Sequence, residues 1–300
     1  MNINISNKIF KGIHRGIDLC EYLWSLSLEG FNNPFTPKVK NLRKHTSLQL
    51  LSNGPSLKDF LSDELTDEII EQYDFLIVND FVKSTNFERI KPSFCVWSDP
   101  MFFEHTLFEE RAIEAINMMA ERTKWPLTLF IPKNRLKSKF LNPLRENKNI
   151  NFIGFHSFPY KGFEILRTYF ERRGLASGQY GNVSINAVYV GLMLGYKNIF
   201  LHGVDYTFFT KLCINEQNEL CHFNEHFFDN KPVEIKPIIC QYKGFEGVYK
   251  TSYYITEMSS RFKGHDIMAS LAKKMNVNVY NCVKESLIDS YPRKYNLYNQ

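Results

Sequence analysis

The chain has 300 residues, of which 44% are hydrophobic and 23% are charged, a composition that excludes an intrinsically disordered protein. Its length suits one large domain, or one domain with a smaller lid. With 37 basic and 32 acidic residues, the formal net charge is +5, too small and too evenly spread to indicate nucleic-acid binding. Small anionic ligands or a membrane surface are compatible with it. Aromatic residues reach 15%, which is the unusual figure.

Six cysteines are scattered along the chain, and no two of them form a Cys-x-x-Cys pair. This spacing favours reduced thiols in a cytoplasmic protein over a zinc site or a disulfide framework. The N-terminal segment lacks the long apolar core of a secretory signal, so we expect none. The longest apolar-rich run, residues 185–201, is interrupted by Asn186 and Lys197, and we therefore expect no membrane-spanning helix.

Residues 1–45 are predicted to form an N-terminal helical extension. A partly amphipathic pattern over residues 13–28 predicts a helix, and Asn32-Asn33-Pro34 ends it. Such a helix either packs against the domain or contacts a membrane surface or another protein copy.

Residues 46–208 alternate between apolar strands and helices. The predicted strands cover residues 47–52, 74–80, 92–100, 126–132, 149–155 and 198–206. The predicted helices cover residues 62–71, 108–121 and 183–194. This alternation is typical of an α/β domain with a mainly parallel, Rossmann-like sheet, which binds its ligands at the carboxyl ends of the strands.

Residues 209–262 interrupt this rhythm with a polar, aromatic-rich stretch. A long insertion of this kind in a compact domain predicts a functional lid or a small subdomain. Residues 263–300 then complete the α/β domain, with a helix over 266–275 and a strand over 276–282.

Polar residues follow several of the predicted strands. Asn53, Gly54 and Ser56 lie in a Ser-Asn-Gly-Pro-Ser turn, where glycine permits close approach of a ligand to the backbone. Asn79 and Asp99 follow the next two strands, and an asparagine can both donate and accept hydrogen bonds to a base or sugar. The alternatives are a purely structural turn and simple strand-end caps.

Ser177 and Gly178 precede the predicted helix over 183–194, and Arg173 lies just upstream. Free N–H groups at a helix start together with an arginine form an anion site, whereas a plain helix entry with a solvated arginine is the alternative.

His265 follows the predicted lid and is a candidate general base, because histidine titrates near neutrality. His222 and His226 lie four residues apart beside Cys221 and Glu225, but this segment lacks a helical pattern, and no Asp-x-Asp occurs in the chain. We therefore expect no metal site.

Together, these segments resemble the bacterial sialyltransferases of glycosyltransferase family 42. The matching segments are LSNGPSLK at 51–58, YDFLIVNDF at 73–81, WSDPMFFE at 97–104, SGQYGNVSINAVYVGLMLGYKNIFLHGVD at 177–205, and Gly264-His265. The sequence departs from the family at Ser52, where a glycine is usual, at Asp99, where an asparagine is usual, and at Arg173, which is shifted by one position.

The resemblance implies a glycosyltransferase-A-like variant of the Rossmann fold and an inverting, metal-independent transfer. A sialic acid or related nonulosonic acid would move from a CMP-sugar donor to a glycan or lipooligosaccharide acceptor. His265 would be the base, and Arg173 and Tyr206 would stabilise the leaving phosphate with the help of the helix start. The donor-binding residues would be Asn53, Gly54, Ser56, Asn79, Asp99, Ser177 and Gly178. It also implies a homo-oligomer and an acceptor side built largely by the lid insertion over residues 209–262. From cysteine usage and net charge we expect a cytoplasmic protein with no nucleic-acid partner, which could lie peripherally at the inner membrane.

Two alternatives stay open. One is a pyrophosphokinase-like or motility-accessory-type relative acting on ATP with magnesium, because these families share the Gly-Pro-Ser-Leu turn. The other is a non-catalytic nucleotide-binding member of a surface-polysaccharide assembly. Selective binding of CMP would favour the transferase over the ATP-dependent enzyme, and turnover of a CMP-nonulosonate would exclude the non-catalytic member.

Overall fold

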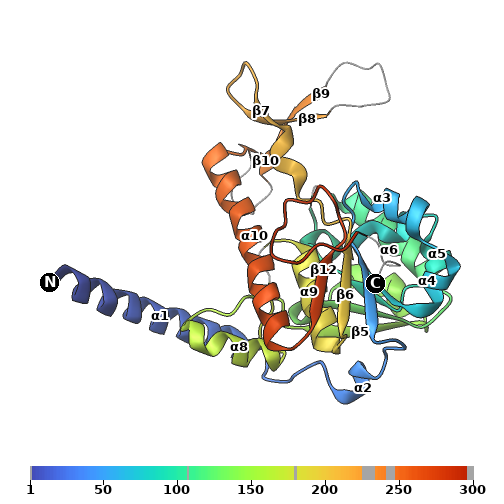
Figure 1. Cartoon of the computed structure of the whole chain (residues 1–300), viewed down its shortest axis with the longest axis horizontal. Coiled ribbons are helices and arrows are strands. Elements are labelled where there is room, and N and C mark those ends of the chain that lie inside the picture. Colours follow the sequence, from blue (N-terminus) through green and yellow to red (C-terminus); the bar gives the residue numbers. More distant parts are fainter. Residues whose placement is uncertain (1, 107, 179–180, 225–233, 241–246, 296–300) are drawn as a thin grey trace.

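A seven-stranded parallel sheet forms the centre of the protein, as the strand–helix alternation predicts (Figure 1). The computed structural model describes residues 2–106, 108–178, 181–224, 234–240 and 247–295. The strands lie in the order β12-β6-β1-β2-β3-β4-β5. Their bounds are Ser47–Leu51 (β1), Asp74–Val78 (β2), Phe94–Val96 (β3), Leu127–Pro132 (β4), Ile150–Phe155 (β5), Asn198–His202 (β6) and Asn278–Asn281 (β12). At the centre, Gln49 of β1 lies between Phe75 of β2 and Phe200 of β6.

Helices cover both faces of the sheet, because successive strand residues point to opposite sides. Leu76 and Val78 join the core on one face, whereas Phe75 and Ile77 join the core on the other. The first core includes α9 (Val183–Leu194) and α10 (Thr251–Lys274). The second core is covered by α4 (Asp67–Gln72), α5 (Phe87–Ile90), α6 (Glu109–Arg122) and α7 (Asn142–Arg145). The result is a three-layer α/β/α domain, which confirms the predicted fold class.

Helix α9 has the predicted bounds, because both of its ends carry strong local signals. The Asn182 side chain accepts a hydrogen bond from the Ser184 N–H at 2.8 Å, and Gly195 ends the helix with a left-handed φ of 85°. The predicted helix over 62–71 is instead divided. Leu65 is extended, and Thr66 caps a new helix, α4, by accepting from the Ile69 N–H.

Helix α10 is much longer than the predicted 266–275 segment. Its buried side chains include Tyr254, Met258, His265, Met268 and Leu271, which recur at helical spacing on one side. The predicted lid boundary at residue 262 therefore falls inside a continuous helix. Polar and aromatic composition between residues 251 and 262 obscured this periodicity.

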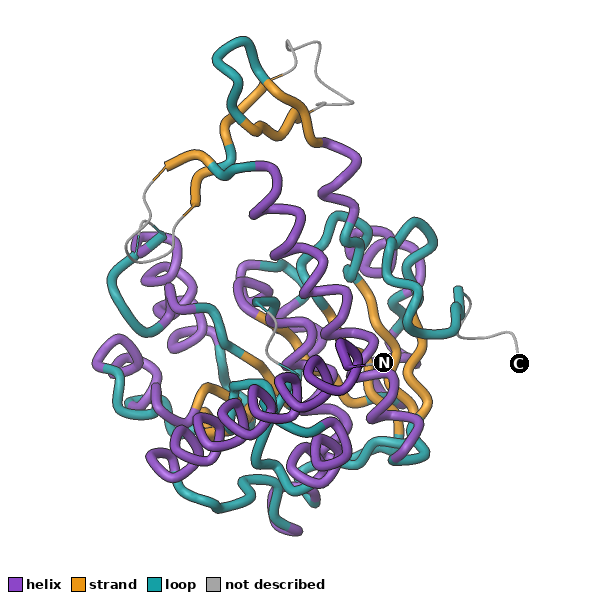
Figure 2. Tube along the Cα trace, turned by 90° about the vertical axis from the view of Figure 1, so that its left-hand side faces the viewer, coloured by secondary structure: helices purple, strands orange, loops and turns teal. Residues whose placement is uncertain are grey.

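The described strands in the rest of the predicted insertion form small antiparallel structures beyond the sheet, in the upper part of Figures 1 and 2. Strands β7 (Leu212–Ile214), β8 (Leu220–Asn224) and β9 (Glu234–Pro237) pair in that order. Strands β10 (Ile239–Cys240) and β11 (Gly247–Val248) form a second, separate pair.

Helix α1 (Asn2–Glu29) extends well beyond the predicted residues 13–28 and projects from the body (Figure 1). Tyr22 and Leu26 anchor it by packing with Tyr160 and Leu175, next to α8 (Glu164–Arg172). The short helices α2 (Pro37–Lys40) and α3 (Leu57–Asp59) complete the α-helices of the described ranges. Within the described ranges, no helix combines the length and the apolar character that a membrane crossing requires.

Candidate functional site

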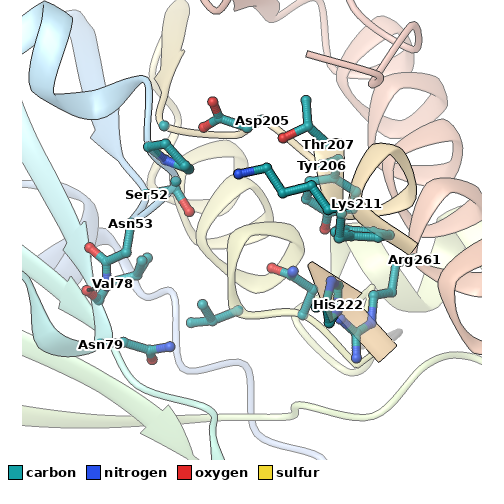
Figure 3. Close-up of a pocket in the computed structure, with 16 residues that line it drawn as sticks. Ser52, Asn53, Val78, Asn79, Asp205, Tyr206, Thr207, Lys211, His222 and Arg261 are labelled. Carbon is teal, nitrogen blue, oxygen red and sulfur yellow. Dashed lines mark hydrogen bonds between the residues drawn. The ribbon is translucent and has the colours of Figure 1, made fainter. Parts of the chain in front are cut away.

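A pocket of about 410 Å³ opens at the carboxyl ends of β1, β2 and β6. The chain runs from β1 outward to β5 and then returns to place β6 on the other side of β1. Such a reversal of strand order is where α/β sheets bind ligands. The lining residues are Ser52, Asn53, Gly54, Pro55, Val78, Asn79, Asn182, Val183, Gly203, Asp205, Tyr206, Thr207, Phe208, Lys211, His222 and Arg261 (Figure 3).

Two loops form one wall of the pocket, and glycines let them meet. A Cβ added to Gly54 would lie 2.0 Å from Asp205 Oδ2 and 2.4 Å from the Gly203 carbonyl oxygen. The Ser56 N–H and hydroxyl both donate to the Asp205 carboxylate, at 3.1 and 2.9 Å. Ser56 is not itself a lining residue. Its hydrogen bonds to Asp205 hold the loop after β1 against the loop after β6.

Replacement of Gly54 by alanine should lower the free energy of unfolding by about 1–3 kcal/mol, because the new methyl group overlaps a backbone oxygen and a carboxylate. Urea unfolding measures this loss. Gly12→Ala in α1 is a control, since no atom lies within 4 Å of its Cβ position. Equal stability of the Gly54→Ala variant and the unmodified protein would show that the two loops separate easily.

Two asparagines from neighbouring strand ends share this side of the pocket. Asn53 donates from Nδ2 to the Val78 carbonyl at 3.2 Å. This bond does not use its Oδ1, which remains a hydrogen-bond acceptor. Asn79 adopts a left-handed φ of 45°, and its buried Oδ1 has no hydrogen-bond partner among the described residues. The amides of Asn53 and Asn79 therefore converge on the pocket from adjacent strand ends.

Cationic groups lie on the opposite wall. Lys211 precedes β7 and reaches toward the wall that carries Ser52 and Asn53 (Figure 3). Arg261 of α10 pairs with Glu257 at 2.6 Å, while its buried Nε has no hydrogen-bond partner in the described parts of the chain. Since the N-terminus of α9 also lines the pocket through Asn182, this side favours an anion.

The sequence analysis did not single out Lys211 or Arg261. Lys211 lies at the start of the insertion, and Arg261 lies in the part of α10 that was assigned to the lid. No local motif marks either residue, because the packing of α10 beside β12 and α9 brings them to one pocket. His222, considered for a metal site, lines the pocket next to Tyr254, with 3.4 Å between its Nε2 and the tyrosine hydroxyl. Glu225 and His226 lie outside the described residues.

Tyr206 connects the pocket to a buried polar network. Its backbone is left-handed, with φ of 56°, a strained conformation for a bulky residue. Its hydroxyl lies 3.1 Å from His265 Nε2 and 3.2 Å from Ser184 Oγ. The other ring nitrogen of His265 lies 3.0 Å from the Tyr291 hydroxyl. His265 is thus fully buried in α10, directly behind Tyr206, and is not a lining residue of the pocket.

Burial determines the protonation states around this network. Desolvation lowers the pKa of His265 to about 3, so the imidazole is neutral at pH 7. Desolvation also raises the Tyr206 pKa, against the smaller effects of the Ser184 hydrogen bond and the Arg261 charge. In the pocket, desolvation raises the pKa of Asp205, while the bonds from Ser56 oppose that rise. Desolvation, followed by the nearby Lys211 charge, lowers the pKa of His222.

The structure places four other predicted site residues outside the pocket lining. Asp99 caps a short 3₁₀ turn by accepting from the Met101 N–H at 3.1 Å, which is the strand-end cap role. Ser177 is buried and donates to Asn186 at 3.2 Å. Gly178 provides space for close packing, because a Cβ there would lie 2.8 Å from both Ile185 and Met268.

Arg173 occupies the C-terminal cap of α8, where it is exposed and its guanidinium stacks over the Tyr169 ring at 4.4 Å. Within the described structure, Lys211 and Arg261 are the cations that line the pocket instead. Arg173 therefore does not line the pocket, and Lys211 and Arg261 supply positive charge there.

Comparisons with known proteins give a similar solved structure. No family model matches the chain, and no curated protein matches it. Among solved structures, it is similar to the MAf glycosyltransferase from Magnetospirillum magneticum AMB-1, with 14% sequence identity and a TM-score of 0.47. The match covers 86% of this chain but 35% of the other, so this chain spans about a third of that protein's length. A likeness at this level assigns neither activity nor substrate.

Proposed function

We propose that the protein is a glycosyltransferase that moves a nonulosonic acid, such as a sialic acid, from a CMP donor to a glycan hydroxyl. The observation that supports this most is the division of the pocket at the strand-order reversal. Amide side chains occupy one wall, and cationic groups with a helix N-terminus occupy the other. A nucleoside monophosphate ester has the same division, with a polar base and ribose at one end and an anionic phosphate at the other.

The cytidine would lie against Asn53 and Asn79. The side-chain amides of Asn53 and Asn79 line the pocket and can exchange hydrogen bonds with the base or with ribose hydroxyls. Gly54, which has no side chain, leaves the β1 loop backbone accessible to the ligand. The segments that resemble family 42 sialyltransferases, LSNGPSLK and YDFLIVNDF, contain these residues and support cytidine as the base.

The phosphate would lie between Lys211, Arg261 and the N-terminus of α9. Negative charge increases on the phosphate oxygens as the bond to the sugar breaks, so cations placed there stabilise the transition state more than the ground state. Arg261 has an additional N–H available, because its buried Nε has no partner among the described residues. These groups would take the role first considered for Arg173.

The acceptor proton would leave through Tyr206. As the acceptor oxygen bonds to the anomeric carbon, the sugar–phosphate bond breaks and its electron pair leaves with CMP. The acceptor proton passes to the Tyr206 oxygen while the tyrosine's own proton passes to Nε2 of His265, 3.1 Å away. The phosphate and the sugar carboxylate of the donor would raise the low pKa of His265 in the complex, because nearby negative charge favours the imidazolium.

A ligand panel tests the proposal at its first step. Isothermal titration with CMP, CDP, UDP and ATP, each with and without magnesium, should show selective, magnesium-independent binding of CMP. Lys211→Met should weaken CMP binding by about 10-fold, as expected for the loss of a charge-assisted phosphate contact. Lys263→Met is the matched control, because this exposed lysine lies on α10 but does not line the pocket.

Turnover of a CMP-nonulosonate in EDTA completes the test, because a phosphate monoester leaving group can be stabilised by protein cations alone. Magnesium-dependent ATP binding without CMP binding would overturn the proposal in favour of a pyrophosphokinase-like enzyme. CMP binding without turnover across a panel of glycan acceptors would favour a non-catalytic nucleotide-binding protein.

A further inference from the structure

Helix α1 carries an exposed apolar stripe that the proposed function does not use. Phe10, Ile13, Ile17 and Trp24 are exposed by 65, 57, 52 and 69% of their surface. With the exposed Cys20, they follow one another at intervals of three, four, three and four residues. This alternation is the heptad spacing of a helix that packs along another helix.

The stripe faces away from the body of the protein. Tyr22 and Leu26, which anchor α1, lie on the opposite side of the helix, given 3.6 residues per turn. Two helix-interior glycines, Gly12 and Gly16, have no atom within 4 Å of their Cβ positions. Each of them weakens a solvent-exposed helix by about 1 kcal/mol relative to alanine. A projecting helix of this composition gains its stability from a packing partner.

We propose that α1 pairs with α1 of a second copy of this chain as an antiparallel coiled coil. With Phe10 opposite Ser27, the two helices overlap over residues 8–29, which is about three heptads and roughly 33 Å. The proposal stands apart from the proposed function, because the pocket contains no residue of α1.

Charge favours a second copy over a membrane surface. Helices that lie on anionic membranes are rich in lysine and arginine on their polar side. Helix α1 instead has equal numbers of each sign: Lys8, Lys11 and Arg15 against Asp18, Glu21 and Glu29.

Side-chain size and charge favour the antiparallel orientation. In that arrangement Phe10 meets the small Ser27 of the other helix, Ile17 meets Cys20, and Trp24 meets Ile13. His14 and Glu21, which flank the stripe, come close to each other across the pair. A parallel pair would instead oppose Trp24 with Trp24.

Sedimentation of the full chain over a concentration series tests the pairing. The unmodified protein should form dimers, and Ile17→Glu should raise the dissociation constant by about 100-fold or more, because it buries an unpaired carboxylate. Ile113→Glu is the control, since this isoleucine is 41% exposed on α6, away from α1 (Figure 1). Circular dichroism and thermal unfolding of each variant verify that the body remains folded.

Crosslinking tests the orientation in a Cys20→Ser background. Mixing His14→Cys and Glu21→Cys variants with a short bismaleimide should give a crosslinked 14–21 dimer, while each variant by itself gives little. Products that join position 14 to position 14 would overturn the antiparallel arrangement. A protein that is monomeric at all concentrations, including one that binds anionic vesicles through the stripe, would overturn the pairing itself.

Discussion

Replacing Tyr206 with phenylalanine should slow sugar transfer by about 100-fold or more and leave CMP affinity nearly unchanged. The hydroxyl is the only group removed, and in the proposed relay it joins the acceptor hydroxyl to His265 Nε2. His265→Ala should have a similar effect, because it removes the final proton acceptor. Steady-state kinetics with a CMP-nonulosonate, together with titration of CMP, separates transfer from binding.

The double variant makes this prediction specific to a relay. Two residues that act in one proton path should not have additive effects, so the double variant should be about as slow as the slower single variant. Tyr253→Phe is the matched control, since this tyrosine of α10 is 70% exposed and does not line the pocket. Near-normal transfer by His265→Ala would remove His265 from the mechanism, and additive losses would place the two residues in separate steps.

The second large effect concerns acid stability. His202 is buried between Gln49 Oε1, 2.7 Å from its Nε2, and the stacked ring of Phe60. Desolvation lowers the pKa of His202 from 6.5 to about 3. Below pH 6.5 the unfolded chain therefore binds a proton that the folded protein does not. The stabilisation that depends on the neutral ring is complete above pH 6.5 and is lost as the pH falls toward 3.

Glu171 acts in the opposite direction. It is 2% exposed, and desolvation, partly offset by Arg167, raises its pKa from 4.5 to about 7. Between pH 7 and 4.5 the folded protein therefore binds a proton that the unfolded chain releases, so acidification stabilises the fold through this residue. The two residues thus oppose each other over the same pH range.

Two variants should consequently change the acid response with opposite signs. Between pH 7 and pH 5, His202→Gln should lose about 2 kcal/mol less free energy of unfolding than the unmodified protein. Glu171→Gln should lose about 2 kcal/mol more. Urea unfolding at the two pH values measures each difference, and absolute stability does not enter the comparison. The same acid response in all three proteins would show that neither residue is held in the stated protonation state.

The sequence by itself determined the architecture of the domain and one wall of the site. Alternating apolar strands and helices specify a parallel α/β sheet, because side-chain periodicity follows backbone geometry. The capped ends of α9 were readable from Asn182 and Gly195. Asn53 and Asn79 were predictable as neighbours, because the carboxyl ends of adjacent parallel strands meet at one edge of a sheet.

Only the tertiary structure decided which residues form the cationic wall of the pocket and which protonation states the buried groups adopt. Lys211 and Arg261 are fifty residues apart in sequence, and they line one pocket because α10 packs along α9, whose N-terminus lines the same pocket. Asp99 and Arg173 carry suitable chemical groups, yet local caps and packing place them outside the pocket. The sequence shows that residue 265 is a histidine, but only its burial behind Tyr206 lowers its pKa. Local patterns fix periodicity and turns, whereas burial and convergence arise from the packing of the whole chain.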